Sequence, residues 1–143
     1  MATTASITLA SDVSGDPVNV SKQATFFKSG STNDLDQTNG LNRVHLRSVT
    51  NKTLLAANAE GNDLAAKVYI INKATDSTTY LTVTINAQTI GKLYAGDWML
   101  MPWSQTDTSA SIEVAATNWT SSKGDIPVEY ALFHEDTDFL TNA

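Results

Sequence analysis

The chain has 143 residues and a net charge of −6, and only 17% of its residues are charged. Its nine Lys and Arg residues are scattered, which excludes the basic patch that nucleic-acid binding requires. It has no cysteine, which excludes a disulfide framework and a thiolate metal site. An acidic surface is repelled by anionic lipids and no apolar run is long enough to cross a bilayer, so we expect no membrane partner.

The length suits one domain covering residues 1–143, with an extended N-terminal segment and a short acidic C-terminal tail. Residues 1–6 have neither the basic start nor the apolar core of a signal peptide, so we expect none there. The absence of cysteine is compatible with assembly in a reducing cytosol. Strands are predicted at residues 6–9 and 18–28. The polar residues 29–40, which follow the second of these strands, are predicted to form a long surface loop.

Residues 41–55 resume the strand character, and Val44, Leu46 and Val49 are candidates for the inner face. Residues 56–66 break this strand. The apolar residues 67–72 then indicate a buried, central strand.

The clearest signal in the sequence is a period of two, which is typical of strands with one buried face. In residues 80–85 it places Leu81, Val83 and Ile85 on one face and threonines on the other. The same alternation recurs near the C-terminus, at Ile112, Val114, Val128, Tyr130 and Leu132. We expect residues 80–85 to pair back on residues 67–72 as a hairpin, and a tight turn at residues 86–87 to lead into a strand at 88–94.

Residues 98–103 are predicted to form a strand after a turn at 95–97, with Trp98 and Leu100 on one face and Met99 and Met101 on the other. Trp98 is expected in the core or between sheets, and Pro102 at a sheet edge. A polar loop is expected at 104–109, and no helix of ten or more residues is predicted. About eight or nine short strands predict an all-β, single-domain antiparallel β-sandwich or jelly roll.

Two histidines are the candidates for catalysis or metal binding. His134 precedes acidic residues in a cluster that superficially resembles a ligand set, but two histidines without cysteine do not build a usual zinc site. We therefore expect His134 to end the last strand and His45 to face outward. The tail acids Glu135, Asp136 and Asp138 are expected to be solvated. The loop acids Asp12, Asp16, Asp34 and Asp36 lack the spacing of a calcium-binding EF-hand, and such residues also suit turns.

The acidic residues on strands, Glu113 and Glu129, alternate with apolar residues and should face solvent. No nucleophile–base pair is visible, so the sequence predicts no catalytic residue, cofactor or metal site, and no enzyme activity. Triplets that match the glycosylation pattern at Asn19, Asn51 and Asn118 are interpreted as chance matches.

Trp103 and Trp119 are candidates for contact with a glycan or a protein partner, because exposed tryptophans stack on sugars and anchor interfaces. For Trp119, which lies in a polar loop, packing within the loop is the alternative. A carbohydrate-binding module would present these aromatic rings as an exposed row.

The segments KVYIIN at 67–72, IGKLYAGDW at 90–98, MPW at 101–103 and VEYALF at 128–133 resemble a pattern of small virion structural proteins of tailed bacteriophages. The similarity covers about half of the chain, and its residues mark hairpins and core positions. It implies a β-sandwich subunit of the capsid decoration (cement) type, made in the host cytoplasm and located on the virion.

The resemblance further implies that the partner is the major capsid protein or another virion protein, and that the chain forms a homo-oligomer, with a trimer favoured. Residues 29–40 and the N-terminal segment are the candidate arms that reach neighbouring subunits. The alternatives are a tail, neck or fibre-associated subunit and a carbohydrate-binding module.

Overall fold

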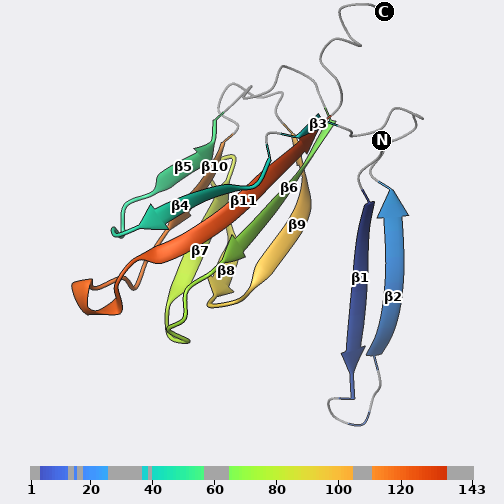
Figure 1. Cartoon of the computed structure of the whole chain (residues 1–143), viewed down its shortest axis with the longest axis horizontal. Helices are drawn as coiled ribbons and strands as arrows, with labels where there is room; N and C mark the ends of the chain where they lie inside the picture. Colours follow the sequence, from blue (N-terminus) through green and yellow to red (C-terminus); the bar gives the residue numbers. More distant parts are fainter. Residues whose placement is uncertain are drawn as a thin grey trace, which may run out of the picture.

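A computed structural model describes residues 4–12, 15, 18–25, 37–38, 40–56, 65–104 and 111–134. In this part of the chain the regular structure includes eleven strands and the short 3-10 turn η2 (Ser121–Lys123). Figure 1 shows how the strands are arranged. The strands are β1 (Thr4–Ser11), β2 (Val18–Thr25), β3 (Gln37–Thr38), β4 (Asn42–Leu46), β5 (Lys52–Leu55), β6 (Ala65–Asn72), β7 (Tyr80–Ile85), β8 (Gln88–Tyr94), β9 (Trp98–Ser104), β10 (Ile112–Ala115) and β11 (Ile126–His134).

Nine of these strands form two sheets that face each other. The small sheet has the order β5-β10-β7-β8, and the large sheet has the order β3-β11-β6-β9, with β4 also paired to β11. Each strand pair in the described residues is antiparallel. The predicted all-β antiparallel sandwich is therefore confirmed.

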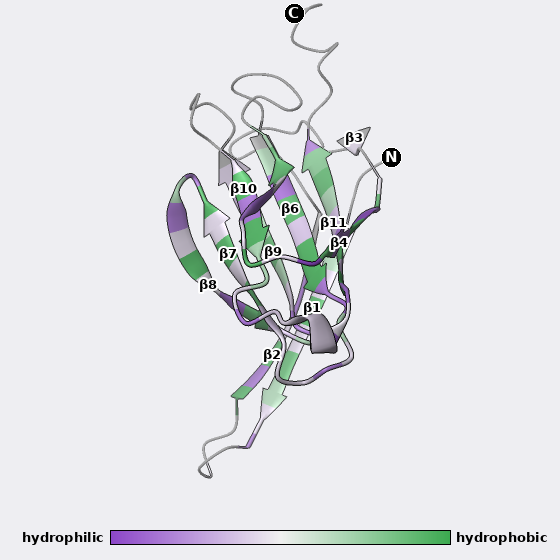
Figure 2. Cartoon of the chain, turned by 90° about the vertical axis from the view of Figure 1, so that its left-hand side faces the viewer, coloured by the Kyte–Doolittle hydropathy of each residue, from purple (hydrophilic) through white to green (hydrophobic). Residues whose placement is uncertain are grey.

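The core lies between the two sheets and follows the predicted alternation. Leu81, Val83 and Ile85 of β7 are buried, whereas the threonines between them face outward. Val68 and Ile70 of β6 meet them from the large sheet as parts of one apolar cluster. Figure 2 shows the alternation as bands of hydrophobic and hydrophilic residues along the strands.

Strands β1 and β2 pair with each other and form a separate two-stranded sheet. This hairpin, which we call the arm, lies beside the sandwich in Figure 1, on the side of β9. Strand β1 extends beyond the predicted residues 6–9 at both ends, and β2 begins at Val18 as predicted. Residues 26–28 of the predicted second strand lie outside the described residues.

The expected hairpin between β6 and β7 is wrong. Both edges of β6 are taken, by β11 and β9, so β7 has no free edge of β6 to pair with. Residues 73–79 instead carry the chain to the small sheet, where β7 pairs with β8 and β10. The tight turn at Asn86 and Ala87 is confirmed, and both residues have the positive φ of a type I′ hairpin turn.

The single strand expected over residues 41–55 is two strands, one in each sheet. A bend at residues 48–50 separates β4 from β5 and leaves Val49 exposed, so its expected inner position is wrong. Val44 and Leu46 face inward as predicted. Within the expected loop at 29–40, Gln37–Thr38 pair with β11 as β3; residues 29–36 and 39 lie outside the described residues, as do 57–64 and 105–110.

Candidate functional site

The large sheet has an apolar strip on its outer face, opposite the core. The register pairs Ile71 with Trp98 and Tyr69 with Leu100, and all four side chains point away from the small sheet. Trp98 is 50% exposed, and its ring lies 6.5 Å from that of Tyr69, centroid to centroid. We call these four residues the outer strip. A sheet whose outer face is apolar over two adjacent strands is suited to packing against another surface.

The arm has one apolar and one polar face. Its register places Ile7 and Leu9 of β1 on the same face as Val18 and Val20 of β2. The opposite face carries Ser, Thr, Asn and Gln side chains almost throughout. Leu9 is 50% and Val18 is 51% exposed. An isolated two-stranded hairpin is marginally stable in water, so this apolar face favours further burial.

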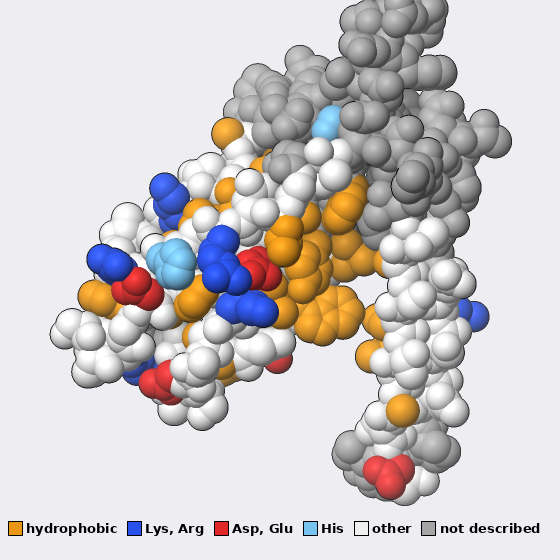
Figure 3. All heavy atoms as spheres, in the orientation of Figure 1, with side chains coloured by type: hydrophobic (Ala, Val, Ile, Leu, Met, Phe, Trp, Pro, Cys, Tyr) orange, Lys and Arg blue, Asp and Glu red, His pale blue; other side chains and the backbone are white. Residues whose placement is uncertain are grey.

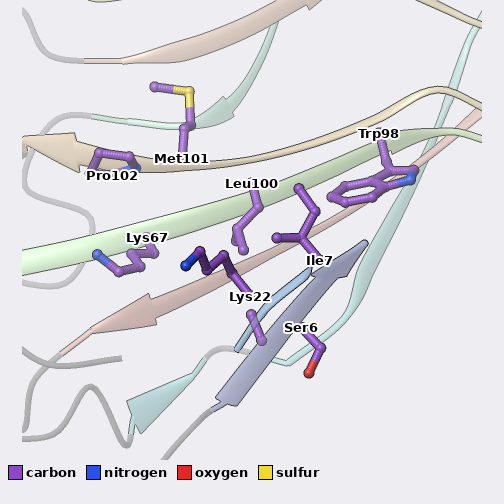
Figure 4. Close-up of a pocket in the computed structure, with 9 residues that line it drawn as sticks. Ser6, Ile7, Lys22, Lys67, Trp98, Leu100, Met101 and Pro102 are labelled. Atoms are coloured by element: carbon purple, nitrogen blue, oxygen red, sulfur yellow. The ribbon is translucent and has the colours of Figure 1, made fainter. Parts of the chain in front are cut away.

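A groove of about 290 Å³ separates the base of the arm from the sandwich. Figure 4 shows Ile7 pointing toward Leu100 and Trp98 across it, with Lys22 and Lys67 nearby. In Figure 3, apolar side chains gather on the side of the sandwich that faces the arm. The groove is lined by Ala5, Ser6, Ile7, Lys22, Lys67, Trp98, Leu100, Met101 and Pro102.

Charged pairs lie beside the outer strip, on the same face of the large sheet. Arg43 of β4 forms a salt bridge with Glu129 of β11, and hydrogen bonding from Arg43 is the main cause that lowers the pKa of Glu129. The positive charge of Lys73 lowers this pKa further. At the end of β4, Arg47 Nε lies 2.7 Å from Asp125 Oδ1.

The Arg47–Asp125 hydrogen bond raises the pKa of Arg47 and lowers that of Asp125. Lys73 lies near the Arg43–Glu129 pair, and Lys67 lines the groove beside the arm. The surface beside the outer strip therefore carries charged side chains of both signs.

The predicted core position of Trp98 is wrong. The two faces of β9 were predicted correctly, but the core takes the face with Met99, Met101 and Trp103, and Trp98 lies outside. Trp103 is only 4% exposed, and its Nε1 donates a 3.3 Å hydrogen bond to Asn86 Oδ1. It is therefore closed to a glycan.

Trp119 packs locally rather than at an exposed site. It is half-buried against the core cluster, and its Nε1 donates a 2.8 Å hydrogen bond to the carbonyl of Gly124. The exposed row of Trp103 and Trp119 that a carbohydrate-binding module would present is not formed. Pro102 lies on β9, an edge strand of the large sheet, as predicted.

The two histidines lie where the sequence predicted. His134 ends β11 and is buried. His45 is exposed on β4, with its Nδ1 3.9 Å from Asp125 Oδ2. Within the described ranges no three His, Asp or Glu side chains lie close enough to hold a metal ion. The other acidic candidates, Asp16, Asp34, Asp36, Glu135, Asp136 and Asp138, lie outside the described residues.

Glu113 and Glu129 lie on the outer faces of the small and large sheets, as predicted. Glu113 accepts hydrogen bonds from Asn51 and Thr53. Of the asparagines in glycosylation-type triplets, Asn118 donates from its side chain to the carbonyl of Thr78, while Asn19 and Asn51 are exposed.

The outer strip and the arm face were missed by sequence reasoning, although a signal for each is present. A strand that is apolar at every position, as at residues 68–71, is typical of burial on both faces. The arm shows the same period of two as the core strands, at Ile7 and Leu9 and again at Val18 and Val20.

Comparison with known proteins found no matching family model, no matching curated protein and no matching solved structure. No helix in the described part of the chain is long and apolar enough to cross a membrane.

Proposed function

We propose that this protein is a non-enzymatic structural subunit of a tailed-phage virion, and that it acts as a capsid decoration (cement) protein on the lattice of the major capsid protein. The observation that carries the proposal is the exposed apolar surface formed by the outer strip and the arm face. The segments that resemble small virion proteins support it, since they include Tyr69, Ile71 and Trp98 of this surface.

The proposed mechanism is adhesion. A stable protein–protein contact buries about 800 Å² on each partner, and most of its binding energy comes from a few aromatic or arginine side chains. Trp98 is the candidate anchor, because it is a large, half-exposed aromatic residue of the apolar strip. The charged side chains beside the strip would set its orientation on the partner surface.

The test is cosedimentation of the purified protein with phage heads that lack the decoration protein. We expect saturable binding with a stoichiometry that matches the symmetry axes of the capsid, and we expect Trp98→Ala to weaken it at least tenfold. Ile90→Ala is the matched control, because Ile90 is a 55% exposed apolar residue on β8, in the other sheet. Binding to tails or fibres instead of heads would support the tail, neck or fibre alternative.

A carbohydrate-binding module is the second candidate, favoured by one observation. Trp98 is exposed and lies beside Tyr69, and such a pair of rings can stack on sugar rings. Glycan-array binding by the isolated protein, lost in Trp98→Ala and retained in Ile90→Ala, would support this candidate. Failure to bind heads together with glycan binding would replace the decoration proposal.

A further inference from the structure

We propose that the groove between the arm and the outer strip binds an acidic, apolar segment of the partner protein. In this extended segment a carboxylate stands two or four residues from a large apolar side chain. Lys22 and Lys67 bind the carboxylate, and Ile7, Leu100 and Trp98 contact the apolar side chains. The inference rests on the proposed function and names the chemistry of the partner segment at the same surface.

The groove has two walls, which come from different parts of the chain. On the arm, Ile7 and Lys22 are partners in the register, so their side chains lie on the same face. On the large sheet, Lys67 is paired with Pro102, four residues along β9 from Trp98. The volume between the walls is about 290 Å³, near the small end of the range of roughly 300–1,000 Å³ for ligand pockets. The groove can therefore take a few side chains of a partner.

One end of the groove is cationic. Lys22 interrupts the apolar face of the arm and faces the wall that carries Lys67, as Figure 4 shows. No Asp or Glu is among the described residues that line the groove. Two ammonium groups on opposite walls repel each other, and a carboxylate between them turns this repulsion into charge-assisted hydrogen bonds. This end therefore favours an anionic group.

The other end is apolar. Ile7 points from the arm toward Leu100 and Trp98, and Trp98 is half exposed. Along the large sheet, Leu100 and Trp98 lie two and four residues from the position opposite Lys67. Side chains two residues apart in an extended segment lie on the same face, about 7 Å from each other. A segment with its carboxylate at Lys67 therefore places its next apolar side chains over Leu100 and Trp98.

Charge reversal at Lys22 tests the inference on phage heads that lack the decoration protein. Lys22→Glu puts a carboxylate where that of the partner binds, so we expect cosedimentation to weaken at least tenfold. Lys52→Glu is the matched control, because it makes the same change in net charge at an exposed lysine of β5, an edge strand of the small sheet. It should leave binding within twofold. Lys22 is also exposed, and circular dichroism checks that each variant is folded.

Two peptides give a readout that does not depend on heads. Both are acetylated and amidated, and their sequences, Glu-Ala-Leu-Ala-Leu and Gln-Ala-Leu-Ala-Leu, differ in one charge. Each is titrated into the ¹⁵N-labelled full chain, and the amide resonances of Ile7, Lys22 and Leu100 are followed. We expect the acidic peptide to shift them at least three times as far as the neutral peptide does, and we expect this difference to vanish in Lys22→Glu.

Two results would overturn the inference. One is head binding by Lys22→Glu that equals head binding by Lys52→Glu. The other is equal shifts with the two peptides, or shifts confined to residues outside the groove. If the unchanged chain and Lys22→Glu bind heads equally well, this inference fails and the decoration proposal stands. If the acidic peptide enters the groove but the unchanged chain does not bind heads, the decoration proposal fails and the groove keeps its assigned chemistry.

Discussion

Asn72 of β6 donates a 2.9 Å hydrogen bond from its side-chain amide to the carbonyl of Leu93 on β8, which joins the two sheets through the core. Its side-chain oxygen accepts a second bond, from the backbone N–H of Ala74. Its backbone carbonyl accepts from Gly96 and its backbone N–H donates to Asp97. Asn72 therefore holds the turn in which the chain crosses from β8 in the small sheet to β9, the strand that carries Trp98.

Replacing this side chain should destabilise the sandwich. Asn72→Ala leaves the carbonyl of Leu93 without its partner in a fully buried position, and a buried unsatisfied group costs about 1–3 kcal/mol in addition to the lost packing. We expect the free energy of unfolding to fall by roughly 2–4 kcal/mol in urea titrations. Asn51→Ala, at an exposed asparagine, is the control and should change it by less than about 0.5 kcal/mol. Equal effects of the two variants would contradict the role given to Asn72.

A glycine at residue 87 should stabilise the protein. Ala87 has a φ of 65°, and the left-handed region costs a residue with a Cβ atom about 1 kcal/mol. The turn with Asn86 becomes Asn-Gly in Ala87→Gly, the favoured sequence for a type I′ hairpin. We expect the free energy of unfolding to rise by about 0.5–1 kcal/mol in the same titration.

Ala95→Gly, in the turn between β8 and β9, is the control. Ala95 does not have a positive φ, so a glycine there relieves no backbone strain. It should leave the stability unchanged or lower it. A loss of stability in Ala87→Gly equal to that of Ala95→Gly would show that the β7–β8 turn does not adopt the left-handed conformation.

The salt bridges beside the outer strip predict a loss of stability in acid. The pKa of Glu129 lies below its ordinary 4.5, chiefly because Arg43 hydrogen-bonds to the carboxylate. The carboxylate of Glu129 therefore releases its proton more readily in the folded chain than in the unfolded chain. The stabilisation that results is complete above pH 4.5 and is lost as the pH falls through the lower pKa of the folded chain. We expect the urea midpoint to fall in that window, and less steeply in Glu129→Gln.

Arg43→Gln removes the other partner and should flatten the acid dependence in the same way. Arg43 is largely exposed, so the effect at neutral pH should be small and 1 M NaCl should reduce it further. An acid dependence in both variants identical to that of the unchanged chain would contradict the assigned cause.

The sequence predicts which face of a strand points to the core better than it predicts which strands pair with each other. The threonines of β7 mark one face as polar, so Leu81, Val83 and Ile85 could be assigned to the core from a period of two. The partner of β7 could not be predicted, because alternation carries no information on which edge is free; the occupied edges of β6 decide it. Trp98 was misplaced for a related reason: both faces of β9 are apolar, so the pattern does not distinguish the core from the outer strip.

Trp103 and Trp98 should separate folding from assembly, because they lie on opposite faces of β9. Trp103→Ala removes a buried ring from the core and should lower the free energy of unfolding by about 3–5 kcal/mol. Trp98→Ala removes a half-exposed ring and should lower the stability of the isolated chain by about 1 kcal/mol or less. If Trp98 anchors the contact with the capsid, the same variant should weaken cosedimentation with undecorated heads at least tenfold. A Trp98→Ala protein that binds heads as tightly as the unchanged chain would show that the outer strip is not the contact surface.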